Sequence, residues 1–129
     1  MATVVVGYVP KPEGEAALAA AVGEAQRHDA RLVVVHTPRE GDGDQGYLDQ
    51  LRATLAAAGV DHDLRIVPPG EGTTGDLVTV AEEVDATLIV IGLRRRSPVG
   101  KLILGSNAQR VLLDAPCPVL TVKPQAGGR

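Results

Sequence analysis

Two hydrophobic patterns alternate along this chain. Residues 3–9, 31–37 and 88–91 are runs of β-forming residues with little polar interruption. Such runs are typical of strands that are buried on both faces, as in a parallel sheet. Residues 62–67 instead alternate polar and apolar side chains, which indicates a strand with one exposed face or a strand at a sheet edge. Val119–Val122 is the last predicted strand.

Four helices are predicted between these strands. The spacing of apolar residues and the flanking turn residues predict them over residues 13–28, 47–58, 73–84 and 106–114. Five strands alternating with four helices indicate βαβ units, and therefore an α/β fold with a parallel sheet. In this fold class, ligands bind beyond the carboxyl ends of the strands, where the strand order reverses.

Composition narrows the class of partner. The 129 residues carry a net charge of -3, so no general basic field attracts nucleic acid. Phe and Trp are absent, and Tyr8 and Tyr47 are the only aromatic residues, which nearly excludes a platform for stacking bases. We therefore expect no nucleic-acid partner, and a core built from Val, Leu, Ile and Ala.

We expect a single domain over residues 1–129, with 125–129 as a frayed tail. The sequence shows no internal repeat and no second domain. The first residues run directly into a predicted strand without a basic region, and the sequence has no long apolar run. These features predict no signal peptide, no membrane partner and a cytoplasmic protein.

Candidate metal ligands and nucleophiles are sparse. Cys117 is the only cysteine and lies between two prolines, so it is interpreted as a small buried hydrophobic residue rather than a reactive thiol. The three histidines are far apart in the sequence and lack the spacing of metal ligands: His28, His36 and His62. We therefore predict no metal site and no catalytic residue.

Two glycine-rich segments resemble ligand-binding loops but fail on spacing. Residues 70–75 match GxGxxG, yet no Asp or Glu occurs at residues 93–105, where a dinucleotide-binding loop needs an acidic partner. We interpret this segment as a flexible loop. Residues 42–46 begin like a calcium loop, but the twelfth position, which requires Glu, holds Ala53. We interpret it as a solvated loop.

The strongest candidate site follows the strand at residues 88–91. Gly92 begins a basic loop that contains Arg94–Arg96 and Lys101, and Gly105 then precedes a helix that opens at Ser106. Glycines allow close approach of the backbone, and free N–H groups at a helix N-terminus attract anions. The arginines therefore fit either a phosphate clamp or a solvated loop, and the sequence leaves both readings open.

These motifs resemble the universal stress protein family. Its signature is a glycine, two residues, a second glycine, nine residues and then Gly-Ser or Gly-Thr, and Gly92, Gly105 and Ser106 fall at the correct spacing. The following AQRVLLDAPCPVLTVK resembles the closing helix and strand of the family, and VVVGYVPKPEGEAAL its opening. The resemblance implies a three-layer, Rossmann-like sheet in the order 3-2-1-4-5. It also implies an ATP site at the junction of strands 1 and 4.

The family pattern is altered at three positions. Val9 and Lys11 stand where ATP-binding members carry Asp and Ser, and Arg95 replaces the second signature glycine. Val9 cannot accept a hydrogen bond through its side chain, whereas Arg95 brings a cation. By resemblance, Thr37 falls where the family contacts adenine through the backbone. Asn107 still carries a side-chain amide that can donate to a phosphate.

Three functions follow, in order of preference. The first is a stress-response module that binds ATP or AMP, with Mg in the case of ATP, through Gly92, Arg95, Gly105, Ser106, Asn107, Thr37 and Val9. The second is a dimeric interaction protein that binds no nucleotide. In both, a homodimer is expected through Val119–Val122, because that strand has no charge to protect its edge. The third is an enzyme with weak ATP hydrolysis, for which the sequence offers no convincing general base.

Overall fold

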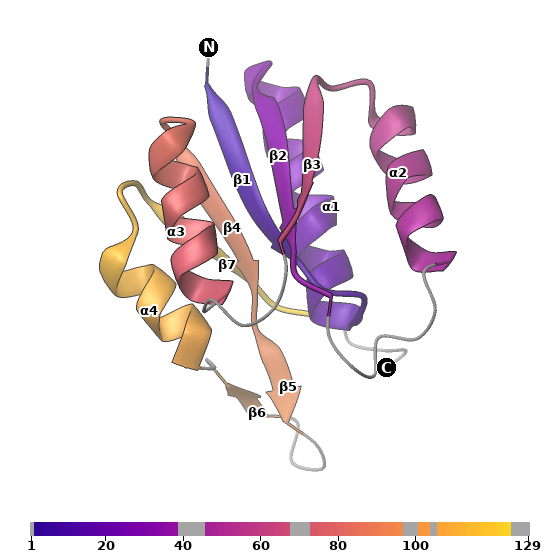
Figure 1. Ribbon diagram of the computed structural model, residues 1–129. Helices are drawn as coiled ribbons and strands as arrows, with labels where there is room; N and C mark the ends of the chain where they lie inside the picture. The colour runs from indigo at the N-terminus through magenta and orange to yellow at the C-terminus, as the bar shows by residue number, and fades with distance from the viewer. Residues whose placement is uncertain (1, 39–45, 68–72, 97–100, 104–105, 125–129) are drawn as a thin grey trace.

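A computed structural model of the chain describes residues 2–38, 46–67, 73–96, 101–103 and 106–124. At residues 73–76, 95–96, 101–103 and 106–107 it describes the backbone alone. Five parallel strands form the central sheet in the order β3-β2-β1-β4-β7 (Figure 1). They are β1 (Thr3–Tyr8), β2 (Arg31–His36), β3 (His62–Ile66), β4 (Leu88–Gly92) and β7 (Val119–Val122). The predicted order 3-2-1-4-5 is confirmed, with β7 as its fifth strand.

Helices cover both faces of the sheet and make three layers (Figure 1). The four predicted helices are present as α1 (Pro12–His28), α2 (Gly46–Ala58), α3 (Thr73–Glu83) and α4 (Ser106–Asp114). Side chains of α1 and α2 share one core cluster, and side chains of α3 and α4 share the other. The sheet therefore separates two apolar cores.

The unbroken apolar runs arise because both faces of the central strands are buried. Val4 and Val6 belong to the core under α1 and α2, whereas Val5 between them faces α3 and α4. The same alternation holds in β2, where Val33 and Val34 lie on opposite faces and both are fully buried. Burying one such side chain stabilises the fold by about 1.5–3 kcal/mol, which favours apolar residues in the middle of these strands.

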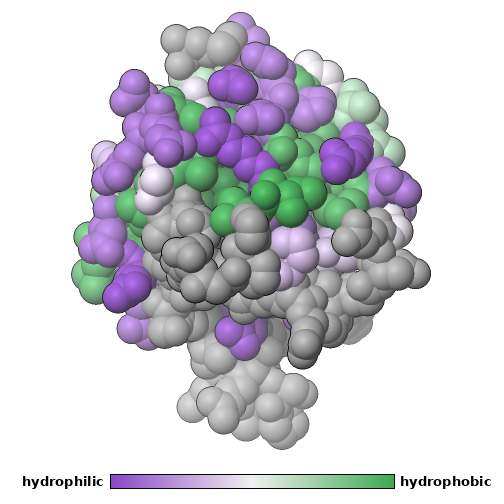
Figure 2. Space-filling model, in the orientation of Figure 1, coloured by the Kyte–Doolittle hydropathy of each residue, from purple (hydrophilic) through white to green (hydrophobic). Residues whose placement is uncertain are grey.

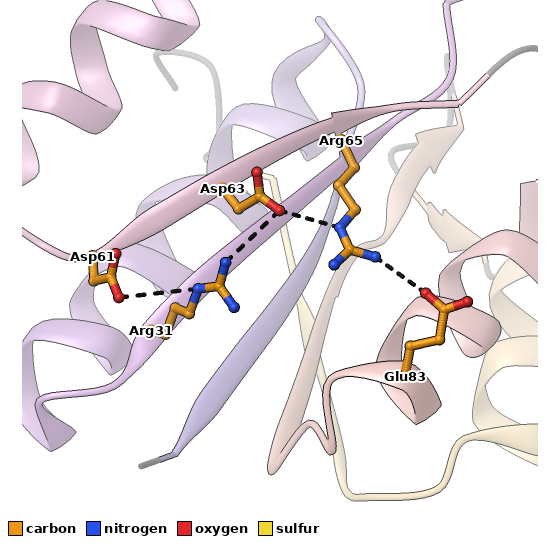
Figure 3. Close-up of polar contacts among 5 residues, drawn as sticks. All are labelled: Arg31, Asp61, Asp63, Arg65 and Glu83. Atoms are coloured by element: carbon orange, nitrogen blue, oxygen red, sulfur yellow. Dashed lines mark hydrogen bonds and ion pairs between the residues drawn. The ribbon is translucent and has the colours of Figure 1, made fainter.

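The edge strand β3 has a charged face, as its alternating sequence predicted. Arg65 contacts Asp63 at 3.2 Å and Glu83 of α3 at 3.2 Å, and Arg31 of β2 reaches Asp63 at 3.9 Å and Asp61 at 4.0 Å (Figure 3). In the view of Figure 2, hydrophilic and hydrophobic residues are intermixed across the upper half of the molecule. Such exposed pairs add little stability each, but charge along an edge disfavours pairing with another strand.

The expectation of a basic loop after β4 was wrong. β5 (Arg94–Arg96) and β6 (Lys101–Ile103) form a two-stranded antiparallel hairpin that extends beyond the carboxyl end of β4 (Figure 1). Residues 97–100, between the two strands, lie outside the described residues. Apolar Leu102 and Ile103 stand opposite arginines in the register, which allows short strands to form where the charges alone suggested a loop.

Element boundaries differ from the predictions by at most one residue. β1 ends at Tyr8 and β2 at His36, so Val9 and Thr37 follow their strands instead of closing them. Gly59 lies directly after α2 with a φ of +72°, the left-handed conformation in which glycine commonly ends a helix. Within the GxGxxG segment, residues 73–75 begin α3 and are not part of a loop, while residues 70–72 lie outside the described residues.

Candidate functional site

The strand order reverses between β1 and β4, and this junction brings predicted site residues to one edge of the sheet. Val9 follows β1, Thr37 follows β2, and Gly92 is the last residue of β4. Because all three strands are parallel, their carboxyl ends meet at the same edge. The hairpin and the start of α4 lie at this edge as well (Figure 1). We call this end of the sheet, at the junction of β1 and β4, the crevice.

On the β1 side, the first turn of α1 packs directly on the backbone. The N–H of Lys11 donates to the carbonyl of Val9 at 2.8 Å, and Pro12 then opens the helix. A Cβ atom at Gly14 would stand 1.8 Å from the oxygen of Val9. Only glycine permits this approach, so a residue that weakens the isolated helix is required by its packing.

Gly92 has the same role on the other strand. A Cβ atom there would stand 2.2 Å from the carbonyl oxygen of Glu13, in the first turn of α1. The end of β4 and the start of α1 are therefore in backbone contact. The signature glycine has a structural reason that the sequence alone did not reveal, and a direct contact from Gly92 to a ligand stays a prediction.

The β4 side of the crevice is rich in cations. Arg94 is exposed at the base of the hairpin, and the register sets Arg95 opposite Leu102 and Arg96 opposite Lys101. Like charges directly opposite each other destabilise an antiparallel pair. Residues 93–105 contain no Asp or Glu to offset them.

α4 begins beside this hairpin, at Ser106, with Asn107 as its second residue. The first N–H groups of a helix have no partner within the helix, and together with the helix dipole they attract an anion. The predicted order of glycine, hydroxyl residue and helix is thus confirmed from Ser106 onward. Gly105 lies outside the described residues.

A buried polar cluster beneath the crevice was missed by the sequence analysis. His36 is 1% exposed, and its ring nitrogens lie 3.0 Å from the carbonyl oxygen of Tyr8 and 2.9 Å from the hydroxyl of Tyr47. The adjacent Thr37 is 8% exposed. The sequence did carry a signal for this cluster. Tyr8 and His36 alternate in step with the strand residues that face α1 and α2, such as Val6 and Val34. The spacing rules for metal ligands do not detect such a pattern.

Metal and thiol chemistry find no support in the described part of the chain. It contains no group of three or more His, Cys, Asp or Glu side chains that could hold a metal ion. Burial raises the pKa of the Cys117 thiol, so this side chain stays protonated at neutral pH and reacts slowly.

The described residues also include no helix that is long and apolar enough to cross a membrane.

Comparison with known proteins places these features in context. Residues 1–123 match the universal stress protein family. A universal stress protein of Mycolicibacterium smegmatis is 43% identical over 94% of this chain and 97% of its own length. A universal stress protein of Archaeoglobus fulgidus in complex with dAMP superposes with a TM-score of 0.65 at 30% identity, over 95% of this chain and 98% of that one. A universal stress protein in complex with cAMP superposes with a TM-score of 0.74 at 27% identity, over 96% of this chain and 98% of that one.

Proposed function

The chain belongs to the universal stress protein family, and from this premise we propose that it is a stress-response module that binds an adenine nucleotide in the crevice. The observation that carries the proposal is the coincidence of a helix N-terminus with a basic hairpin free of carboxylates, at the point where the strand order reverses. Two similar solved structures hold cAMP and dAMP, which supports an adenine nucleotide over other anions.

The phosphates and the base use different sides of the crevice. The phosphates lie over the start of α4, at Gly105, Ser106 and Asn107. Arg95 of the hairpin neutralises part of their charge. The base lies across the ends of β1 and β2, against Val9 and the backbone of Thr37. Gly92 contributes by holding the first turn of α1 in place, because any side chain there would displace Glu13.

Cations replace neutral groups at this site, so phosphate charge contributes strongly to affinity. The side chain of Val9 offers the ligand no hydrogen-bond acceptor, whereas Lys11 and Arg95 both add positive charge. The residues present do not fit a magnesium ion held by the protein, because residues 93–105 contain no Asp or Glu and the described residues contain no metal-binding group. Magnesium would therefore enter only on the phosphates of ATP, and AMP would bind without it.

We assign the site to binding rather than to catalysis. Glu15, in the first turn of α1, accepts a hydrogen bond from the hydroxyl of Tyr8 at 2.5 Å and is engaged below the crevice. No carboxylate in residues 93–105 is available to orient a water molecule on the phosphates. ATP hydrolysis above background, lost in hairpin variants, would contradict this assignment.

Calorimetric titration of nucleotide-stripped protein tests the proposal. ATP and AMP should bind saturably to the wild type, and Gly105→Val should abolish binding because a branched side chain blocks the approach of the phosphates. Circular dichroism establishes that the variant is folded. Unchanged affinity in Gly105→Val would contradict this position of the phosphates, and absence of heat from every nucleotide would contradict nucleotide binding itself.

We further propose a homodimer that pairs β7 with its symmetry mate. The carbonyl of Pro118 accepts a hydrogen bond from Ile89 of β4 at 3.0 Å, and that of Val122 accepts one from Leu93, directly after β4, at 2.8 Å. Backbone direction alternates along a strand, so Val119 and Thr121 point their N–H and C=O groups away from the sheet. β7 carries no charge, and Leu113 of the preceding helix is 83% exposed. This edge therefore lacks the charged side chains that protect β3.

Light scattering on two variants tests the dimer. Thr121→Pro removes an outward N–H group without removing a bond to β4, so it should give a monomer. Thr121→Ala is the matched control and should remain a dimer, as should the wild type. A monomeric wild type, or a dimeric Thr121→Pro, would contradict pairing through β7. A dimer that binds no nucleotide would instead support the second function, an interaction protein of the same fold.

A further inference from the structure

His36 is the least exposed polar side chain in the described core, and both of its ring nitrogens are engaged. Nδ1 lies 3.0 Å from the carbonyl oxygen of Tyr8, and Nε2 lies 2.9 Å from the hydroxyl of Tyr47. A carbonyl only accepts, so Nδ1 donates to Tyr8, whereas the Tyr47 hydroxyl can exchange a hydrogen bond with Nε2 in either direction. The imidazole thus bridges β1 to α2.

The bridge acts at the last rung between two strands. Tyr8 and His36 are the final registered pair of β1 and β2, so the His36 side chain bonds the backbone of its own cross-strand partner. The next residues along the two strands are Val9 and Thr37. Thr37 directly follows the last registered pair of β1 and β2, so the position of its backbone depends on how His36 is held.

The second arm of the bridge fixes a helix. Tyr47 is the second residue of α2, and its ring meets the His36 ring edge-on with centroids 5.4 Å apart and planes at 90°. Edge-on packing leaves the Tyr47 hydroxyl directed at Nε2. The start of α2 is therefore tied to the same rung as the end of β1.

We propose that His36 is the positioning residue of the base subsite: by bridging Tyr8 and Tyr47 it sets the Thr37 backbone at the spacing that a purine needs. The inference rests on the proposed nucleotide site and deepens it, because it assigns base affinity to a side chain that never touches the ligand. The phosphate half of the crevice, built by the hairpin and α4, is independent of this bridge.

Two tyrosine variants separate positioning from core packing. Tyr47→Phe removes one hydroxyl from the bridge and keeps the ring, and should weaken ATP binding about fivefold, the value expected for losing one neutral hydrogen bond. Binding of inorganic tripolyphosphate, which has no base, should not change. Tyr8→Phe is the matched control: it removes the hydroxyl bonded to Glu15 but keeps the Tyr8 carbonyl, so the affinity for both ligands should match the wild type.

Variants at His36 itself test the direction of the bridge. His36→Asn keeps an N–H near the position of Nδ1 and should retain part of the ATP affinity, whereas His36→Leu removes both arms and should lose more. The tyrosine variants decide the matter if His36→Leu does not fold.

The outcomes distinguish this inference from the proposed function. A loss of ATP affinity in Tyr47→Phe with tripolyphosphate unaffected supports the positioning role. Unchanged ATP affinity, equal weakening of both ligands, or the same loss in Tyr8→Phe would overturn it while leaving nucleotide binding intact. Absence of ATP binding in the wild type would overturn the proposed function and the inference with it.

Discussion

Where the first turn of α1 packs on the ends of β1 and β4, backbone meets backbone: Cβ atoms at Gly14 and Gly92 would stand 1.8 and 2.2 Å from the carbonyl oxygens of Val9 and Glu13. On the β4 side, four cations lie on a hairpin that extends beyond the sheet, with no carboxylate among residues 93–105. The contact with α1 is the packed side of the crevice, and an added methyl group would disrupt it. The hairpin is the charged side, and an anionic ligand would offset its positive charge.

This difference separates two kinds of consequence. Substitutions on the packed side should affect folding, and ligand affinity only through folding. Substitutions on the charged side should affect ligand affinity and change stability little, because charges outside a protein core contribute little to the free energy of unfolding. A nucleotide-binding protein can therefore change its ligand by altering the hairpin without altering its fold.

The largest effect is expected for Gly14→Ala. The added methyl group collides with the Val9 carbonyl, and such overpacking against rigid backbone should cost about 3 kcal/mol or more. Gly23→Ala is the matched control in the same helix, since its Cβ atom would find only Arg27 Nη1 at 3.7 Å. That variant should gain about 0.5–1 kcal/mol from helix propensity. Urea unfolding measures both, and equal stability of the two variants would contradict the packing described for α1.

A smaller loss is expected for Gly92→Ala. Its methyl group meets the Glu13 carbonyl, and shifting the first turn of α1 should cost about 2–3 kcal/mol. Gly7→Ala in β1 is the control, because its nearest neighbour is the flexible end of Leu77 at 3.3 Å, and it should stay within about 1 kcal/mol of the wild type. A Gly92→Ala protein with wild-type thermal stability that fails to bind ATP would show that Gly92 contacts the ligand directly.

Charge neutralisation in the hairpin should alter affinity alone. Arg95→Gln should weaken ATP about tenfold through loss of a charge-assisted hydrogen bond, and should weaken AMP less, because AMP carries fewer phosphates. The salt dependence of ATP affinity should fall as well. Arg52→Gln on the exposed face of α2 is the control and should change neither ligand. A drop in the melting temperature of Arg95→Gln would mean that the two sides of the crevice are not independent.

The architecture was predictable because its signals are local. Unbroken apolar runs require strands buried on both faces, and Val4, Val5 and Val6 show both cores drawing on one strand. The strand order is not local, and it came from the resemblance at Gly92 and Gly105 rather than from the hydrophobic pattern. The hairpin escaped prediction because three arginines in succession lack the alternation by which strands are recognised.

The site was only partly predictable. Val9, Thr37 and Gly92 meet at one edge as expected, since parallel strands end together. The packing of Gly14 was invisible, because a glycine in a sequence indicates conformational freedom and not the atom that approaches it. His36 was set aside for lack of ligand spacing, whereas its partners are a backbone carbonyl and a tyrosine eleven residues on.

Backbone amide NMR of the 13.4 kDa chain, titrated with ATP, tests the central claim most directly. We predict that the largest shifts occur at Thr37, Ser106 and Asn107 and along β5 and β6, with β3 and the end of α2 unchanged. Largest shifts on the charged face of β3 or along β7, or no shifts at saturating ATP, would contradict a nucleotide site at the junction of β1 and β4.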